Sequence, residues 1–190
     1  AQGLDGTLYL CGGGGLDAID PASRATRWTV PYPYCTSVAV HGDGSVVSIQ
    51  TGVIRATWPD GVVRWVGNDG SGNATRVAIG GDGTVYTYGA SGVLSAWDIA
   101  TGASRWTTDT GSSGGHGLAV LGDGRVVVNG LDGLRIYDPV ECLDSDCLPT
   151  RHWGSGSAGD QFGGIGDPIV GPTGLISVLT TAGELQAFDP

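Results

Sequence analysis

GDGTVYTYGASGVLSAWDIATGASRW, residues 81–106, alternates glycine-containing turns with short segments rich in β-branched and aromatic residues. The segments Thr84–Tyr88, Val93–Trp97 and Arg105–Thr107 each follow such a turn. Short alternating runs between glycine turns are typical of antiparallel hairpins. With Arg76–Ile79 ahead of the first turn, the stretch predicts four antiparallel strands in about 40 residues, which is the span of one β-propeller blade.

The turns of this stretch return along the whole chain. We expect the glycine of each turn, and less readily the aspartate, to adopt positive φ, as two-residue hairpin turns require. A repeated supersecondary unit predicts one continuous array of blades rather than separate domains. The copies are Asp5-Gly6, Asp43-Gly44, Asp82-Gly83 and Asp123-Gly124, with Thr173-Gly174 as a degenerate fifth.

The last turn of the unit carries a motif of its own. Ala96, Asp98, Thr101, Gly102 and Trp106 follow the spacing Ala-x-Asp-x-x-Thr-Gly-x-x-x-Trp, and other units match it in part. This spacing resembles the quinoprotein-like β-propeller repeat, also called the PQQ repeat. The resemblance implies an all-β fold of four-stranded antiparallel blades. It extends to outer-membrane assembly scaffolds without a cofactor and to quinone-dependent alcohol dehydrogenases, so it specifies a fold rather than a reaction.

The repeats divide residues 1–190 into five blades of one propeller. The fifth lacks a tryptophan-bearing fourth strand, and Ala1–Leu4 makes a poor leading strand for the first. We therefore expect the chain to be part of a larger propeller of roughly six to eight blades. The resemblance implies that Trp28, Trp65, Trp106 and Trp153 dock against neighbouring blades and are structural. The approximate blade ranges are 1–36, 37–75, 76–116, 117–164 and 165–190.

Composition limits the function classes. The 36 glycines lie mainly at turn positions between β-rich segments, which favours hairpins over disorder. The net charge of −10, with no lysine among the basic residues, argues against nucleic acid as a partner, since phosphate binding needs clustered basic residues. No apolar run approaches the roughly 20 residues that span a bilayer as a helix.

Four cysteines allow three pairings. In a meander blade, the turn between the second and third strands and the loop to the next blade share one face. Cys11 and Cys35 fall on that face, whereas Cys142 and Cys147 share one long turn on the opposite face. We predict the disulfides Cys11–Cys35 and Cys142–Cys147 and an oxidising, extracytoplasmic compartment. A metal site at Cys142 and Cys147 is the weaker alternative, because nothing beside them completes four ligands.

Candidate binding residues lie in the long loops between blades. Tyr32 and Tyr34 in Pro31–Cys35 are expected either to stack on a partner or sugar or to cap the apolar layer between blades. Asp69, Ser71 and Asn73 alternate like the start of a calcium loop, but Gly80 stands where its last ligand belongs, which favours a solvated turn. The complete candidate set is Tyr32, Tyr34, Asp69, Asn73, Asp109, His116, Asp160 and Phe162.

The sequence offers no catalytic constellation. His41, His116 and His152 have no nucleophile elbow near them, and the resemblance to quinone enzymes would require adjacent cysteines, which are missing. We therefore expect no enzyme activity, no cofactor and no metal. The predicted function is a non-catalytic extracytoplasmic module that binds a protein or its own copies in a surface or secreted assembly. The alternatives are a fragment of a PQQ- and calcium-dependent dehydrogenase and a carbohydrate-binding propeller.

Overall fold

The computed structural model describes residues 1–69, 74–112, 117–142, 147–154, 166–180 and 183–190. In these ranges the chain forms five antiparallel sheets, called the first to fifth sheet in chain order. The strands are β1 Leu8–Gly12, β2 Gly15–Ile19, β3 Thr26–Pro31, β4 Cys35–Val40, β5 Val46–Gln50, β6 Val53–Thr57, β7 Val63–Asn68, β8 Ala74–Ile79, β9 Thr84–Gly89, β10 Val93–Asp98, β11 Ser104–Asp109, β12 Gly117–Val120, β13 Val126–Gly130, β14 Gly133–Tyr137, β15 Arg151–Gly154, β16 Ile169–Val170, β17 Ile176–Leu179 and β18 Leu185–Phe188.

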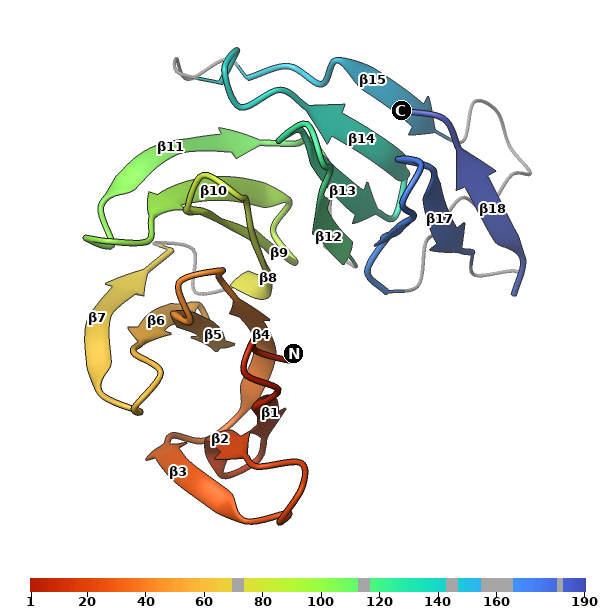
Figure 1. Ribbon diagram of the computed structural model, residues 1–190. Helices are drawn as coiled ribbons and strands as arrows, with labels where there is room; N and C mark the ends of the chain where they lie inside the picture. The colour runs from red at the N-terminus through yellow and green to blue at the C-terminus, as the bar shows by residue number, and fades with distance from the viewer. Residues whose placement is uncertain (70–73, 113–116, 143–146, 155–165, 181–182) are drawn as a thin grey trace.

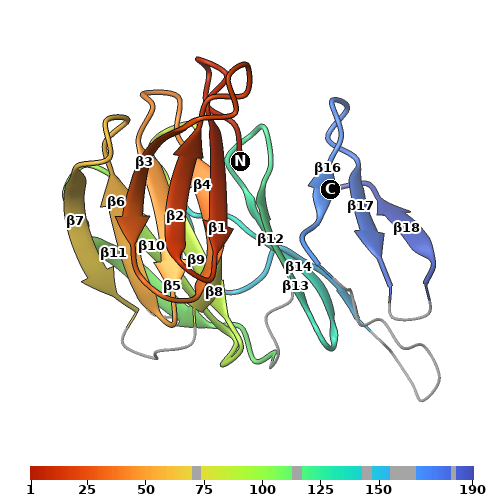
Figure 2. The ribbon, with the colours of Figure 1, turned by 90° about the horizontal axis from the view of Figure 1, so that it is seen from below.

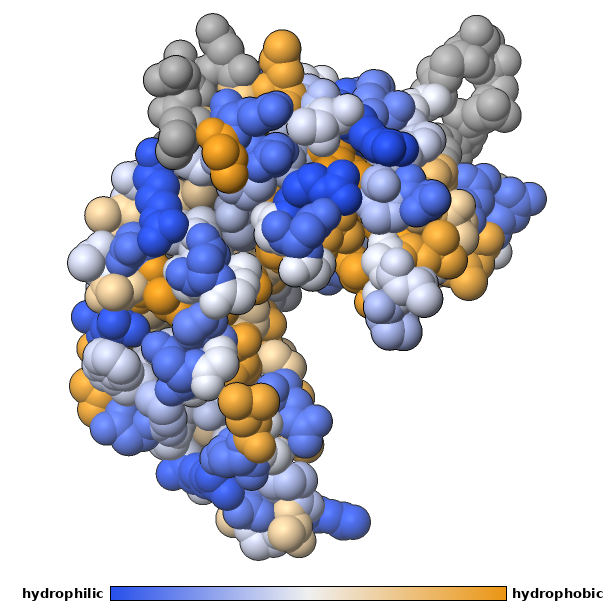
Figure 3. Space-filling model, turned by 45° about the horizontal axis from the view of Figure 1, so that its top comes forward, coloured by the Kyte–Doolittle hydropathy of each residue, from blue (hydrophilic) through white to orange (hydrophobic). Residues whose placement is uncertain are grey.

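Each sheet is a meander in which consecutive strands pair. The second, third and fourth sheets have four strands, and the first and fifth have three. The sheets follow one another along an open arc, with the first and fifth at its two ends (Figure 1). The space-filling view shows the same arc with its opening between the two ends (Figure 3). The predicted all-β propeller architecture of antiparallel blades is confirmed.

The two three-stranded sheets lie where the sequence pattern is incomplete. Ahead of β1, Gln2 forms a single bridge with Leu8, and the Ala1 and Tyr9 backbones exchange hydrogen bonds of 2.9 and 3.0 Å. The leading strand expected at Ala1–Leu4 is therefore reduced to one bridge. In the fifth sheet, β18 pairs with β17 on one side and with no other described strand on the other.

The sheets stand side by side in sequence order (Figure 2), and the hydrophobic core consists of layers between successive sheets. Alternate residues of a strand point to opposite sides of a sheet, so an inner strand contributes to two layers. In β5, Val46 packs with the first sheet, and Val47 and Ile49 pack with the third. All six residues of β9 are buried, as expected for a strand covered on both faces. The blade stacking thus follows from the period-2 pattern.

The Asp-Gly turns differ from the expectation in one respect. The glycines adopt positive φ, 80° at Gly83, but the aspartates do not. Each aspartate instead accepts a hydrogen bond from the backbone N–H two residues later, as Asp82 does from Thr84 at 2.9 Å. Asp5, Asp43 and Asp123 do the same. The expectation of positive φ for aspartate was wrong, because its side chain stabilises the turn as an Asx cap.

Two tryptophans on the outermost strands of their sheets dock on a turn glycine of the next sheet. Trp65 of β7 donates its indole N–H to the Ile99 carbonyl at 2.7 Å, and its ring covers Gly102. A β-carbon at Gly102 would lie 2.6 Å from Trp65 Cδ2, and the φ of 73° also favours glycine. Trp28 repeats this contact on Gly61, where a β-carbon would lie 2.8 Å away. These docked rings join consecutive blades.

The later tryptophans meet different surfaces. Trp106 of β11 packs in one core cluster with Cys142 and Cys147, which are only 1% and 4% exposed. Trp153 of β15 contacts Phe188 of the fifth sheet, with ring centroids 5.4 Å apart. The third and fourth tryptophans thus pack in the layers between sheets without the glycine contact seen for Trp28 and Trp65.

Both predicted disulfides are confirmed. Cys11 of β1 bonds Cys35 of β4 and so ties the first sheet to the second, with Cα atoms 4.9 Å apart. Cys142 bonds Cys147, and Thr108 of β11 donates to the Cys147 carbonyl at 3.3 Å. Cys147 thus contacts β11, the outer strand of the third sheet. Neither bond joins cysteines that are adjacent in the sequence.

Candidate functional site

The sheet-to-sheet loops and the turns between second and third strands share one side of the arc, here called the loop face. The opposite side, which holds the other turns, is called the turn face. The strand order places Tyr32, Tyr34, Asp69 and Asp109 on the loop face. The remaining candidates, Asn73, His116, Asp160 and Phe162, lie outside the described residues.

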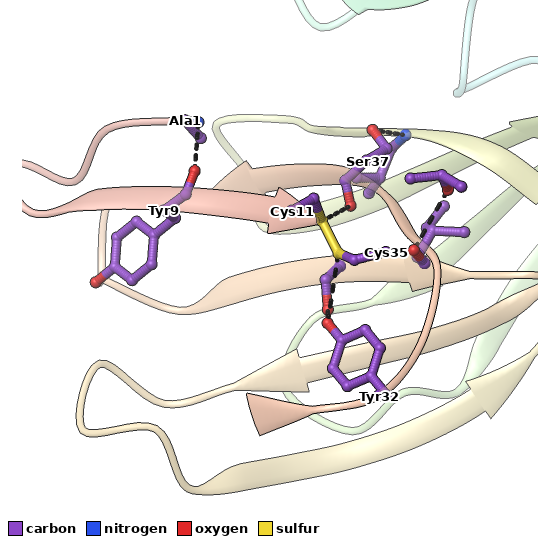
Figure 4. The surroundings of a disulfide bond; sticks show 10 residues. Ala1, Tyr9, Cys11, Tyr32, Cys35 and Ser37 are labelled. Carbon is purple, nitrogen blue, oxygen red and sulfur yellow. Dashed lines mark hydrogen bonds between the residues drawn. A yellow bond between two sulfur atoms is a disulfide. The ribbon is translucent and has the colours of Figure 1, made fainter. Parts of the chain in front are cut away.

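The two tyrosines of Pro31–Cys35 have opposite surroundings. Tyr32 is 6% exposed, and its hydroxyl contacts the Ser48 hydroxyl and lies 3.7 Å from the Cys35 sulfur (Figure 4). Tyr34 is 72% exposed. Tyr32 therefore belongs to the apolar layer between the first two sheets, and Tyr34 alone presents its ring to solvent.

Tyr34 is held in an uncommon backbone conformation. Its φ is 61°, in the left-handed region that bulky residues rarely adopt. Neighbouring residues fix this conformation, because the Cys35 disulfide follows directly and the Tyr32 N–H donates to the Gly14 carbonyl at 3.2 Å. A constrained loop with an exposed ring loses little conformational entropy on binding. This geometry suits a contact residue for a partner.

Asp69 and Asp109 are engaged by their own loops. Asp69 accepts the Ala74 N–H at 2.6 Å, and Asp109 accepts the Gly111 N–H at 2.9 Å. Within the described ranges, no group of three His, Cys, Asp or Glu side chains is arranged to hold a metal ion. Of the calcium-like loop, Asp69 is described and accepts the Ala74 N–H, whereas Ser71 and Asn73 lie outside the described residues, so the solvated-turn interpretation stays a prediction.

Sequence reasoning missed a partly buried polar cluster between the third and fourth sheets. Arg135 of β14 donates to Asp132 at 2.9 and 2.5 Å, and the Ser112 hydroxyl also contacts that carboxylate. The Tyr137 hydroxyl nearby is buried without a hydrogen-bond partner, and burial raises the pKa of Tyr137 to about 12. An arginine inside the apolar run Gly133–Tyr137 was the available signal, because such a charge needs a partner when buried.

The Asp132–Arg135 pair predicts a specific pH dependence of stability. The hydrogen-bonded Arg135 guanidinium lowers the pKa of Asp132 to about 2 in the folded protein. The contribution of this pair to the free energy of unfolding is therefore complete above the pKa of an unfolded aspartate, about 3.9. It is lost as the pH falls through the lower pKa that Asp132 has in the folded protein. The free energy of unfolding of the wild type should fall between these two pH values. In Asp132→Asn this fall should be smaller, because the titrating carboxylate has been removed. Urea denaturation at each pH measures the free energy.

Asp109→Asn is the matched control for this measurement, since Asp109 forms no ion pair with an arginine among the described residues. Its pH profile should follow the wild type. Identical profiles for Asp132→Asn and the wild type would show that the pair contributes nothing measurable.

The turn face contains a cavity of about 640 Å³ between the third and fourth sheets. Asp82, Asp123 and Asp138 line it, together with Tyr86 and Val140. Each carboxylate is already hydrogen-bonded: Asp82 by Thr84, Asp123 by Arg125 and Asp138 by the Val140 N–H. The cavity wall is thus built from the capped turns of the repeat and offers no uncommitted acidic group.

The described residues include no helix of the length and apolar character needed to cross a membrane.

The repeat geometry agrees with a comparison against protein families. The family described as outer membrane protein assembly factor BamB matches residues 12–190. The chain belongs to this family. The match covers the four docked tryptophans, the turn glycines other than Gly6, and three of the four cysteines. Cys11 lies one residue before its start. No curated protein matches the chain.

Solved structures show the same fold at low sequence identity. The WD40 β-propeller domain of Doa1 superposes with a TM-score of 0.76 at 14% identity, over 97% of this chain and 61% of that one. The computationally designed Ika8 protein superposes with a TM-score of 0.73 at 16% identity, over 93% of this chain and 52% of that one. The extracellular domain of the putative hybrid two component system BT3049 from B. thetaiotaomicron superposes with a TM-score of 0.77 at 14% identity. The superposition covers 100% of this chain and 27% of that one. This chain therefore spans less than two thirds of these propeller chains.

Proposed function

We propose that the chain is a non-catalytic, extracytoplasmic propeller module that binds a protein partner or its own copies in a surface or secreted assembly. The observation that carries this proposal is Tyr34, an aromatic side chain 72% exposed on a loop fixed by a disulfide and two prolines. Rigid exposed aromatic residues are the typical anchors of protein interfaces. The loop face, on which Tyr34 lies, is the proposed interface.

The compartment is part of the same proposal. Two disulfides support an oxidising environment, because thiols stay reduced in the cytosol. The family description refers to outer membrane assembly, and one similar structure is an extracellular domain. The non-catalytic role is supported by four carboxylates, which cap turns or pair with arginine: Asp69, Asp82, Asp109 and Asp132.

Tyr34→Ala tests the interface. Because Tyr34 is exposed and alanine keeps the same backbone constraint, we expect the free energy of unfolding to change by less than about 0.5 kcal/mol. Removal of an interface anchor should weaken partner binding by at least about tenfold. The measurement is recovery of the partner from an extract of the natural source by immobilised wild type and variant.

Val62→Ala is the control, since Val62 is 58% exposed but lies on the turn face. It should recover the partner like the wild type. Equal recovery by wild type, Tyr34→Ala and Val62→Ala would remove Tyr34 from the interface. Selective loss with Val62→Ala would move the interface to the turn face.

A further inference from the structure

Two arginines occupy the same position in their sheets. Arg55 is the third residue of β6, and Arg135 is the third residue of β14. Each lies between a residue of the second strand and one of the fourth: Ser48 and Val66 beside Arg55, Val128 and His152 beside Arg135. Each side chain faces the preceding sheet. Arg55 and Arg135 can therefore be compared directly, as the same residue type at the same position in two sheets.

The guanidinium of Arg135 has a carboxylate partner within its own turn. Asp132, three residues earlier, accepts two hydrogen bonds from it, at 2.9 and 2.5 Å. The Arg135 side chain is only 9% exposed, so this ion pair compensates a nearly buried charge.

Arg55 lacks such a partner, because Gly52 stands three residues earlier in the place of Asp132. No described carboxylate lies within ion-pair distance of Arg55. Its guanidinium carbon lies 4.3 Å from the Tyr32 ring centroid, and its Nη1 atom is buried without a hydrogen-bond partner. A buried N–H group without an acceptor is unusual in native proteins. The Nη1 group of Arg55 thus lacks a hydrogen-bond acceptor.

The two strand neighbours of Arg55 differ in exposure. The residue itself is partly exposed, and Val66, its neighbour on the outer strand β7, is 55% exposed. Ser48, on the other side, is buried. The Arg55 side chain, stacked on the Tyr32 ring, thus lies between a buried inner neighbour and an exposed outer one, while its Nη1 atom is buried.

We propose that Arg55, stacked on Tyr32, is a binding subsite for one carboxylate group of a ligand, which takes the place that Asp132 has beside Arg135. Guanidinium groups bind carboxylates through paired N–H donors, which gives both charge and geometric selection. The carboxylate belongs either to a free small acid or to an acidic side chain of a partner. The inference goes beyond the proposed function, since it holds for either source.

The test is an NMR titration of the arginine side-chain Nε–H signals with sodium acetate, with sodium chloride at equal ionic strength as the reference. We expect a saturable shift of the Arg55 signal in the millimolar range and no comparable shift of Arg135. Arg55→Gln should abolish the saturable response of nearby backbone amides, whereas Arg24→Gln, which removes an exposed charge from the turn face, should retain it.

Gly52→Asp provides a variant that keeps Arg55, since aspartate tolerates positive φ better than most residues and φ at position 52 is 77°. It should supply the missing carboxylate and abolish the acetate response.

A titration with acetyl-Gly-Glu-Gly-amide, against its glutamine counterpart, distinguishes the two sources of the carboxylate. Binding tighter than that of acetate assigns the site to a protein side chain, and equal binding assigns it to a small acid. No saturable shift at Arg55, an equal shift at Arg135, or a response that persists in both Arg55→Gln and Gly52→Asp would overturn the proposal.

Discussion

Trp65→Ala is expected to lower the free energy of unfolding by about 2–4 kcal/mol, less than for a fully buried aromatic side chain, because the indole is only partly buried between the two sheets. The indole fills the contact between the second and third sheets, covers Gly102 and donates a 2.7 Å hydrogen bond to Ile99. Alanine removes both contacts and leaves the Ile99 carbonyl without its donor. Since the glycine turn offers no side chain to fill the space, little of the loss can be recovered by relaxation.

Trp58→Ala is the matched control. Trp58 belongs to the same sheet but is 40% exposed, and its main contact is Arg64, whose guanidinium carbon lies 4.1 Å from the ring centroid. An exposed cation–π contact contributes about 0.5–1 kcal/mol, so a loss near that value is expected. Urea denaturation of both variants provides the comparison. Equal losses for Trp58 and Trp65 would contradict the docking role of Trp65.

Replacing Cys11 and Cys35 together by alanine is expected to lower the free energy of unfolding by about 3 kcal/mol. The bond closes a loop between cysteines 24 residues apart, and its removal restores that conformational freedom to the unfolded chain. The shorter Cys142–Cys147 loop, with a separation of 5, should contribute about 2 kcal/mol by the same relation. The measurement is chemical denaturation of the oxidised wild type and of each double variant.

Reductant serves as the control for the disulfide prediction. In the Cys11→Ala/Cys35→Ala variant, reductant should remove only the stabilisation by Cys142–Cys147. In the wild type it should remove the stabilisation by both disulfides. If reductant leaves the stability of the wild type unchanged, the two bonds do not stabilise the fold and the expectation is wrong.

The fold was largely predictable, because its determinants are local and repeated. The alternation of Thr84–Tyr88 and Val93–Trp97 identifies strands, and the turn glycines separate them. The disulfide pairing followed from the same repeat, since a meander assigns each turn to one face. Cys11 and Cys35 then had to meet across two sheets, and they do.

The site was less predictable, because exposure depends on tertiary contacts. Tyr32 and Tyr34 both neighbour proline in Pro-Tyr-Pro-Tyr, yet one is buried beside Ser48 and the other is 72% exposed. The positive φ of Tyr34, which no local rule predicts for tyrosine, accompanies this separation. Arg55 and Arg135 likewise look equivalent in sequence, and their difference lies in Gly52 and Asp132, whose effect appears only once each turn is placed beside its arginine.

The most direct test of the proposed interface places a photoreactive phenylalanine derivative at position 34 and crosslinks the protein in its natural source. The account predicts one covalent adduct of defined mass, containing a second protein or a second copy of this chain. The same probe at Val62 on the turn face should not form this adduct. An adduct from position 62 with none from position 34 would contradict the assignment of the loop face as the interface.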